Sequence, residues 1–149
     1  MGQDQDYPEH TFRFRVPLSY IDTGGVVYNG RYLDIYNQAR DEQMRDIGYP
    51  YMTLVTQDRN HLTVVEANVQ YKAPVFYDDV IDIVSRVEKI GSRSIIVNQA
   101  MYRQGEEQPC NQARFVMVCV GEGFKTCTIP AKLIHAHQLQ EKKNENSCF

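Results

Sequence analysis

The sequence predicts an α+β fold in which one long helix is packed against an antiparallel sheet, in the order β-α-β-β-β-β. Three observations support this prediction. Apolar and polar residues alternate near the N-terminus, the apolar spacing becomes helical over residues 30–47, and four further strand patterns follow. Turn signals separate these four patterns about every twelve residues, with no helix between them, which is typical of an antiparallel meander.

Length and composition indicate one soluble globular domain. The chain has 149 residues, of which 42% are apolar and 23% charged. Its net charge of −3 offers no basic field, so we expect no nucleic-acid partner. No apolar run approaches the roughly 18 residues that a membrane span needs, so we expect no span. We place the domain at residues 11–139, between a frayed N-terminus (1–10) and a polar C-terminal tail (140–149).

The cysteine and histidine patterns predict a cytoplasmic protein without a metal site. The N-terminal residues are polar and contain no apolar signal core. The cysteines show no Cys-x-x-Cys spacing, so we interpret all four as reduced thiols (Cys110, Cys119, Cys127 and Cys148). His135 and His137 are two residues apart on a predicted short helix and face different ways. We interpret them, with His10 and His61, as structural or surface residues.

The first predicted strand covers residues 11–21. One of its faces is apolar, formed by Phe12, Phe14, Val16 and Leu18. Pro17 cannot donate a hydrogen bond to a neighbouring strand, which favours an edge position or a bulge.

The predicted long helix covers residues 30–47. Its core face is formed by residues at helical spacing, namely Tyr32, Ile35, Tyr36, Ala39, Gln43 and Ile47. Asn29 is a suitable N-cap, Gly48 is suited to the position just after the helix, and Pro50 prevents its continuation. Residues 51–60 carry no pattern that predicts an element.

The four later strands are predicted at residues 65–72, 80–90, 94–103 and 112–120, with a short helix over residues 130–139. The last strand is apolar on both faces from Phe115 to Val120, and a strand of this kind needs cover on both sides. One long helix covers only one face of a sheet. We therefore expect a second copy of the chain to cover the other, in a homodimer or homotetramer.

The turn before the long helix carries the main candidate for chemistry. Asp22 follows the first strand, Gly24 and Gly25 allow a tight turn, and residues 26–28 form a short apolar plug. A carboxylate beside a helix N-terminus, where unpaired N–H groups favour negative charge, is an arrangement that acyl transfer requires. The alternative is that Asp22 only closes an Asx turn.

These residues resemble the signature of a known family. The pattern Asp22-x-x-Gly25-Val26-Val27-Tyr28, followed by Arg31-Tyr32-Leu33 and by Ala39-Arg40, is similar to that of the hotdog-fold acyl-CoA thioesterases. The branch that it most resembles contains the 4-hydroxybenzoyl-CoA and YbgC-type enzymes. The resemblance continues through residues 69–75, 78–80 and 87–94, and it covers the chain from about Phe12 to about Leu133.

The resemblance implies a long central helix wrapped by a curled five-stranded sheet, and hydrolysis of an acyl-CoA thioester to a carboxylate and free coenzyme A. By this likeness Asp22 is the nucleophile or the general base, and the oxyanion site is the backbone at the helix start, near Asn29. Tyr28 is the third candidate catalytic residue. No cofactor is implied, because coenzyme A is part of the substrate. The active sites of the family form at a dimer interface.

The resemblance also suggests residues that bind substrate. Gly25, Val26, Tyr32 and Tyr71 are candidates near the reacting group. Tyr28, Tyr32 and Tyr36 form a stripe at a spacing of four, which is either part of the core or a source of hydroxyls for the acyl pocket. Lys72, Lys89, Arg93 and Arg103 lie near strand ends, where they could bind the phosphates of coenzyme A, and Arg93 is the best candidate.

Two departures from the family pattern leave other functions open. Tyr20 stands where many relatives carry a further Asp, and Asn29 stands where several YbgC-type relatives carry His. One alternative is an enoyl-CoA hydratase or dehydratase of the same fold, whose chemistry usually uses a catalytic His. Another is an acyl-CoA sensor that binds without turnover.

Overall fold

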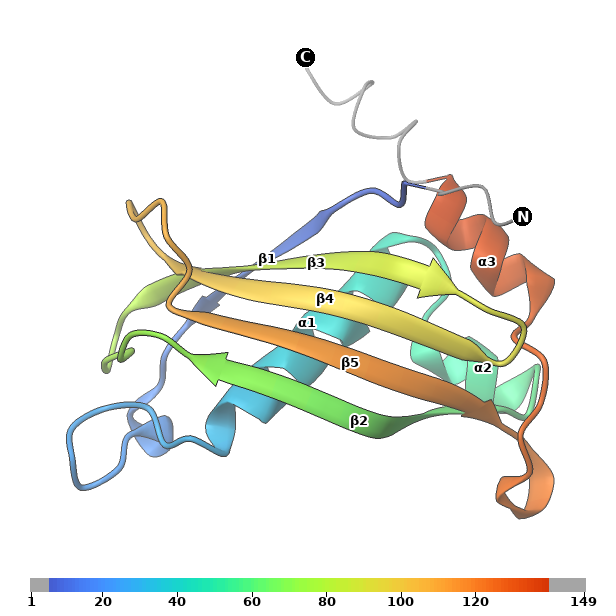
Figure 1. Cartoon of the computed structure of the whole chain (residues 1–149), viewed down its shortest axis with the longest axis horizontal. Coiled ribbons are helices and arrows are strands. Elements are labelled where there is room, and N and C mark those ends of the chain that lie inside the picture. Colours follow the sequence, from blue (N-terminus) through green and yellow to red (C-terminus); the bar gives the residue numbers. More distant parts are fainter. Residues whose placement is uncertain (1–5, 140–149) are drawn as a thin grey trace.

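The structure is a computed structural model and describes residues 6–139. A long helix lies across one face of a five-stranded antiparallel sheet whose strand order is β1-β3-β4-β5-β2 (Figure 1). The strands are β1 His10–Arg15, β2 His61–Tyr71, β3 Val80–Ile90, β4 Ser94–Arg103 and β5 Asn111–Val120, and the helices are α1 Arg31–Asp46, α2 Tyr51–Thr56 and α3 Ala131–Gln138. Two short 3-10 turns are η1 Leu18–Tyr20 and η2 Glu122–Phe124. The predicted α+β order is confirmed. Within residues 6–139, no helix is long and apolar enough to cross a membrane.

The later strands lie close to their predicted positions. The observed bounds of β3 and β4 equal the predicted ones, and β5 begins one residue earlier. β2 begins at His61, four residues before its predicted start, because its register shifts between Val64 and Glu66. Such a bulge interrupts the two-residue period on which the prediction depended. The helix α2 had no predicted counterpart.

The first strand is shorter than predicted. β1 ends at Arg15, and residues 18–20 form the 3-10 turn η1. Pro17 lies between them and has no N–H for a ladder, so the regular pairing stops there. The expected edge position is confirmed, because β1 pairs only with β3.

The prediction of a frayed N-terminus over residues 1–10 is wrong for residues 6–10. Tyr7 and His10 are buried, and His10 pairs with Ser85 at the start of β1. The ring of His10 also lies 2.6 Å from the Asp46 carboxylate at the end of α1. Residues 1–5 and the predicted tail at 140–149 lie outside the described residues.

The helix α1 begins two residues after the predicted cap. Gly30 is its N-cap, no side chain caps it, and the N–H of Arg31 donates to the Tyr28 carbonyl. Asn29 therefore lies inside a turn and does not cap the helix, so that prediction is wrong. The core face is largely as predicted, except that Met44 is buried where Ile47 was expected.

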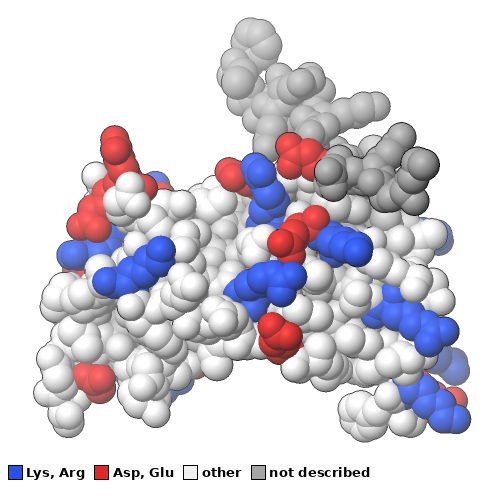
Figure 2. Space-filling view, viewed as in Figure 1, with Lys and Arg blue, Asp and Glu red and all other residues white. Residues whose placement is uncertain are grey.

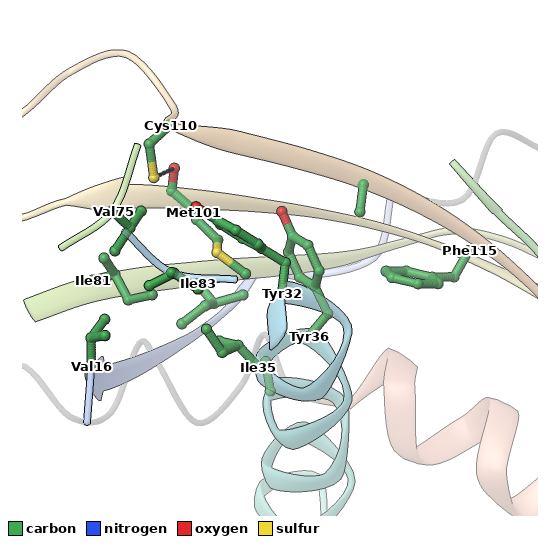
Figure 3. Close-up of a cluster of buried hydrophobic side chains, with 13 residues drawn as sticks. Val16, Tyr32, Ile35, Tyr36, Val75, Ile81, Ile83, Met101, Cys110 and Phe115 are labelled. Carbon is green, nitrogen blue, oxygen red and sulfur yellow. Dashed lines mark hydrogen bonds between the residues drawn. The ribbon is translucent and has the colours of Figure 1, made fainter. Parts of the chain in front are cut away.

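The main core lies between α1 and the sheet. Figure 3 shows Tyr32, Ile35 and Tyr36 of α1 directed toward side chains of the sheet. On β5, Phe115, Met117 and Cys119 are buried on the face toward α1, whereas Val116 and Val118 on the outer face are only half-buried. Figure 2 shows this outer face, where charges of both signs stand beside broad uncharged areas. A second copy as the cover of this face stays a prediction.

Candidate active site

Residues 21–28 form a tight turn that is fixed to the sheet. Ile21 and Val27 make an isolated antiparallel bridge, and the N–H of Asp22 donates to the Val26 carbonyl at 2.9 Å. The N–H of Val27 donates to the Val75 carbonyl at 2.8 Å, and the Val27 side chain is buried. Gly25 has a φ of +81°, a conformation that favours glycine. Of the predicted apolar plug, only Val27 is fully buried.

The carboxylate of Asp22 is exposed and takes part in its own turn. Its Oδ1 accepts the N–H of Gly24 at 2.8 Å, which is the Asx turn that the sequence allowed. Among the described residues, no other group donates a hydrogen bond to this carboxylate. The turn therefore orients Asp22 but leaves it available for another partner.

The start of α1 lies directly after this turn. No described residue accepts the backbone N–H of Asn29 or Gly30. A Cβ atom on Gly30 would lie 2.9 Å from the Tyr28 ring, so the ring packs against this glycine. These N–H groups, with the positive end of the helix dipole, form a potential oxyanion site.

Tyr71 connects β2 to the helix start. Its hydroxyl donates to the Asn29 carbonyl at 2.9 Å, and its ring meets that of Tyr32 edge-on at 5.2 Å. Burial raises the pKa of Tyr32 to about 12, and the nearby charge of Asp22 adds a smaller contribution in the same direction. The structure thus places Tyr71 between the Asn29 backbone and the Tyr32 ring, with Asp22 near enough to Tyr32 to affect its pKa.

The tyrosine stripe divides into two parts. Tyr28 lies before α1 and is 53% exposed, whereas Tyr32 and Tyr36 are buried. The Tyr36 hydroxyl donates to Asn111 Oδ1 at 2.6 Å, so this hydroxyl is part of a buried hydrogen-bonded pair.

Asn111 was not among the predicted site residues, and its buried Nδ2 has no partner within residues 6–139. Its sequence signal was a polar residue at an inward position of an apolar strand.

The candidate phosphate-binding residues do not all lie near Asp22. Lys72 follows Tyr71 at the Asp22 end of the sheet, and Arg103 is held there by Asp79 at 3.1 Å. Lys89 and Arg93 lie at the opposite end, where β3 turns into β4 (Figure 1). A strand of the length of β3 spans roughly 30 Å, so in one chain they are far from Asp22. Within residues 6–139, the Arg93 side chain donates one long hydrogen bond, of 3.4 Å, to the Thr126 hydroxyl.

The edge of the sheet beside this site is open. β2 pairs with β5 on one side only, and Val64, Val65 and Tyr71 are 42%, 60% and 54% exposed. An unpaired strand edge with exposed apolar side chains is a surface on which another strand can pair. No three His, Cys, Asp or Glu side chains of residues 6–139 are arranged to hold a metal ion.

Comparison with known proteins identifies the family. A model of the thioesterase-like superfamily matches residues 16–137. The chain belongs to this superfamily. It is 32% identical over 111 residues to the acyl-CoA thioester hydrolase YbgC of Shigella flexneri, which covers 73% of this chain and 81% of that protein. It is 26% identical over 102 residues to the long-chain acyl-CoA thioesterase FadM of Escherichia coli, covering 68% and 75% of the two chains.

Solved structures show the same fold. The 1,4-dihydroxy-2-naphthoyl-CoA thioesterase of Synechocystis superposes with a TM-score of 0.83 at 17% identity, over 90% of this chain and 98% of that one. A 4-hydroxybenzoyl-CoA thioesterase variant, in complex with 4-hydroxybenzoyl-CoA, gives 0.80 at 20% identity, over 87% and 98%. The predictions of a hotdog fold and of a YbgC-like thioester hydrolase are confirmed.

Proposed function

We propose that the chain hydrolyses acyl-CoA thioesters, with Asp22 as the catalytic carboxylate. The observation that carries this proposal is the pairing of an exposed, oriented carboxylate with unpaired backbone N–H groups at the start of α1. A thioester carbonyl bound at Asn29 and Gly30 would develop its negative charge against these N–H groups. The family assignment and its YbgC-type relatives support the same reaction.

Two routes are open to Asp22. As a nucleophile, it attacks the carbonyl carbon, the C–S bond breaks, and coenzyme A leaves as a thiolate. Water then cleaves the mixed anhydride to the free acid and restores the carboxylate. As a general base, Asp22 takes a proton from the water that attacks the carbonyl directly. In either route the thiolate is a good leaving group, so the thioester is already activated.

Tyr71 has a positioning role in this proposal. Its hydroxyl holds the Asn29 carbonyl, and that peptide group carries the N–H of Gly30. The Tyr32 ring packs edge-on against Tyr71. Burial raises the pKa of Tyr32 to about 12, still further above neutral pH than usual, so the Tyr32 hydroxyl is protonated. Tyr28 packs over Gly30 at the exposed side of the turn, where it can cover the thioester group.

The complete site needs two copies of the chain. β2 runs from His61, at the end that carries Lys89 and Arg93, to Tyr71 at the Asp22 end. When two identical strand edges pair antiparallel about a twofold axis, the start of one lies beside the end of the other. Pairing through the open β2 edge would therefore place Arg93 of the partner subunit near Asp22, where it could bind a coenzyme A phosphate.

The rival functions have less support in the turn. A hydratase of this fold would need a proton-transferring side chain, and residues 20–32 contain no histidine. The described histidines lie elsewhere, and His10 is engaged with Asp46. A sensor without turnover would not require an oriented carboxylate beside unpaired N–H groups.

A panel of acyl-CoA thioesters tests the proposal. The panel should include short, medium and long saturated chains, an aryl ester and an enoyl ester, with both free thiol and free acid measured. We expect equal amounts of thiol and acid from at least one ester. Loss of the enoyl absorbance without thiol release would show a hydratase, and tight binding without any product would show a sensor. Either result would overturn the proposal.

A further inference from the structure

A cavity of about 300 Å³ lies between the C-terminal half of α1 and the inner face of the sheet, at the opposite end of α1 from the Asp22 turn of the same chain. Its walls are largely apolar and include Met44, Leu62, Val64, Ile95 and Met117. Its size is at the lower end of the range for small-molecule sites. Arg40 is one of the few charged residues that line it.

Arg40 is a half-buried cation, and no anionic side chain in the part of the chain that the structure describes pairs with it. Its guanidinium donates to Gln99 Oε1 at 2.8 Å and to Asn37 Oδ1 at 3.4 Å, and it lies 4.2 Å from the centre of the Phe115 ring. It forms no ion pair with any residue in the range 6–139. Burial lowers the pKa of Arg40 to about 10, so it is charged at neutral pH. Its bonds to neutral oxygens only partly replace the hydration that a buried charge loses.

The other titratable groups of the cavity leave this positive charge in place. Asp41 pairs with Arg45 at 2.7 Å, and Arg45 also pairs with Glu42 at 2.6 Å, so neither of these contacts engages Arg40. Burial lowers the pKa of His137 to about 4, and this residue is therefore neutral at pH 7. The Tyr51 hydroxyl accepts the N–H of Leu62 at 3.1 Å. An apolar cavity with one unmatched cation remains.

We propose that this cavity binds a ligand with an apolar body and an anionic oxygen group, and that Arg40 pairs with that group. The apolar walls would hold a chain or ring, and a carboxylate would form a charge-assisted hydrogen bond with the guanidinium. Two sources of this chemistry exist near a thioesterase. One is a free carboxylic acid, and the other is the acyl group of a thioester that carries a second acidic group.

Calorimetric titration with matched ligands tests the site without any turnover. The probes are octanoate, octanol and octylammonium at pH 7. Octanoate should bind at least about tenfold more tightly than octanol, the effect of one charge-assisted hydrogen bond, and octylammonium should bind most weakly. Equal binding of octanoate and octanol would overturn the proposal, even if thioester hydrolysis were fully established.

Variants then assign the preference to Arg40. Arg40→Met keeps the length of the side chain and should abolish the advantage of octanoate over octanol, whereas Arg40→Lys should retain part of it. Arg114→Met is the matched control, because Arg114 is exposed and pairs with Glu88 at 3.0 Å. If Arg40→Met does not fold, the affinities of the three ligands for the wild type and for Arg40→Lys still test whether Arg40 binds the anionic group. An unchanged octanoate preference in Arg40→Met would contradict the proposal.

Inhibition kinetics distinguish the two sources. If the cavity takes the acyl group of the substrate, octanoate will compete with the thioester. The Arg40→Met change should then lower kcat/KM for an acyl-CoA with a terminal carboxylate at least about tenfold more than it lowers kcat/KM for the neutral analogue of that ester. If the cavity takes a free acid as an effector, octanoate will change kcat without competing. Inhibition by octanoate that is equal in Arg40→Met and in the wild type would overturn the role of Arg40.

Discussion

The side chain of Asp22 accepts one backbone N–H of its own turn at 2.8 Å and has no other described donor. One carboxylate oxygen thus makes the hydrogen bond of the Asx turn, and the carboxylate stays exposed to solvent. Sequence reasoning found Asp22 because its neighbours resemble a family signature, and the spacing to the helix start could be counted. It did not find Arg40 or Asn111 as site residues, because their importance depends on which side chains from distant strands surround them.

The hydroxyl of Tyr71 gives a prediction at this scale. Tyr71→Phe removes only the bond to the Asn29 carbonyl and keeps the ring contact with Tyr32. We expect kcat to fall about threefold to tenfold with KM nearly unchanged, the effect of losing one hydrogen bond that positions the oxyanion site. Steady-state kinetics measure it. Tyr77→Phe, on an exposed tyrosine, is the control, and a kcat equal to that of the control would contradict the positioning role.

The charge of Arg93 gives a second prediction. Arg93→Ala should raise KM for acyl-CoA esters with little change in kcat, because a phosphate contact binds the substrate and the transition state equally. Added salt should raise the wild-type KM in the same way, since an exposed charge is screened. Arg114→Ala on the outer face is the control. An unchanged KM in Arg93→Ala would mark Arg93 as an ordinary surface residue.

Among the elements, α3 depends on a buried neutral histidine. His137 is buried on this short helix, and burial lowers its pKa from 6.5 to about 4. Between these values the unfolded chain binds a proton that the folded chain does not, so this histidine makes stability fall as the pH falls. The slope is on the order of 1.4 kcal/mol per pH unit in this window.

Denaturant unfolding at pH 7, 6, 5 and 4 measures this effect. Between pH 6.5 and 4, the free energy of unfolding of His137→Gln should fall less than that of the wild type. His135→Gln is the control, because it changes an exposed histidine two residues away, and its pH profile should follow that of the wild type. Identical pH profiles for the wild type and His137→Gln would show that His137 is not held neutral.

The elements also show where sequence patterns succeed. β3 and β4 alternate regularly between two turns, and their bounds were predicted without error. β2 was predicted too short because the register shift at Val64 breaks its period. The helix α2 was missed because its 6 residues hold too few apolar positions for a pattern. The side chain of Asn29 is of a type that often caps helices. The turn that packs the Tyr28 ring against Gly30 nevertheless makes Gly30 the N-cap, so the helix begins after Asn29.

For the whole molecule, the separation of Asp22 from Lys89 and Arg93 predicts a shared site. Arg93→Ala alone should keep its kcat, so mixing Asp22→Asn and Arg93→Ala chains under conditions of subunit exchange should raise activity at substrate concentrations well below the KM of Arg93→Ala. In a dimer with one chain of each kind, one of the two sites has both native residues. Random exchange makes half of the dimers mixed, so about a quarter of all sites should regain the wild-type KM and kcat.

Light scattering should first give the mass of two or four chains. A monomer mass at micromolar concentration would contradict the shared site. So would a mixture that, at substrate concentrations well below the KM of Arg93→Ala, is no more active than the sum of its parts. The sequence predicted self-association because one strand is apolar on both faces, with the second copy covering the other face of the sheet. It did not predict pairing through a strand edge. That depends on the position of β2 at the end of the sheet, which only the topology reveals.

The turnover of Asp22→Asn tests the proposed catalytic role of Asp22 most directly. The amide keeps the size of the side chain and can still accept the Gly24 N–H, but it cannot act as nucleophile or base. We expect kcat to fall at least about a hundredfold, with the melting temperature and ester binding nearly unchanged. Asp82→Asn, which changes an acid paired with Arg13 on the sheet, should keep full activity. An Asp22→Asn protein that melts early and hydrolyses at the normal rate would show that Asp22 is only a turn residue.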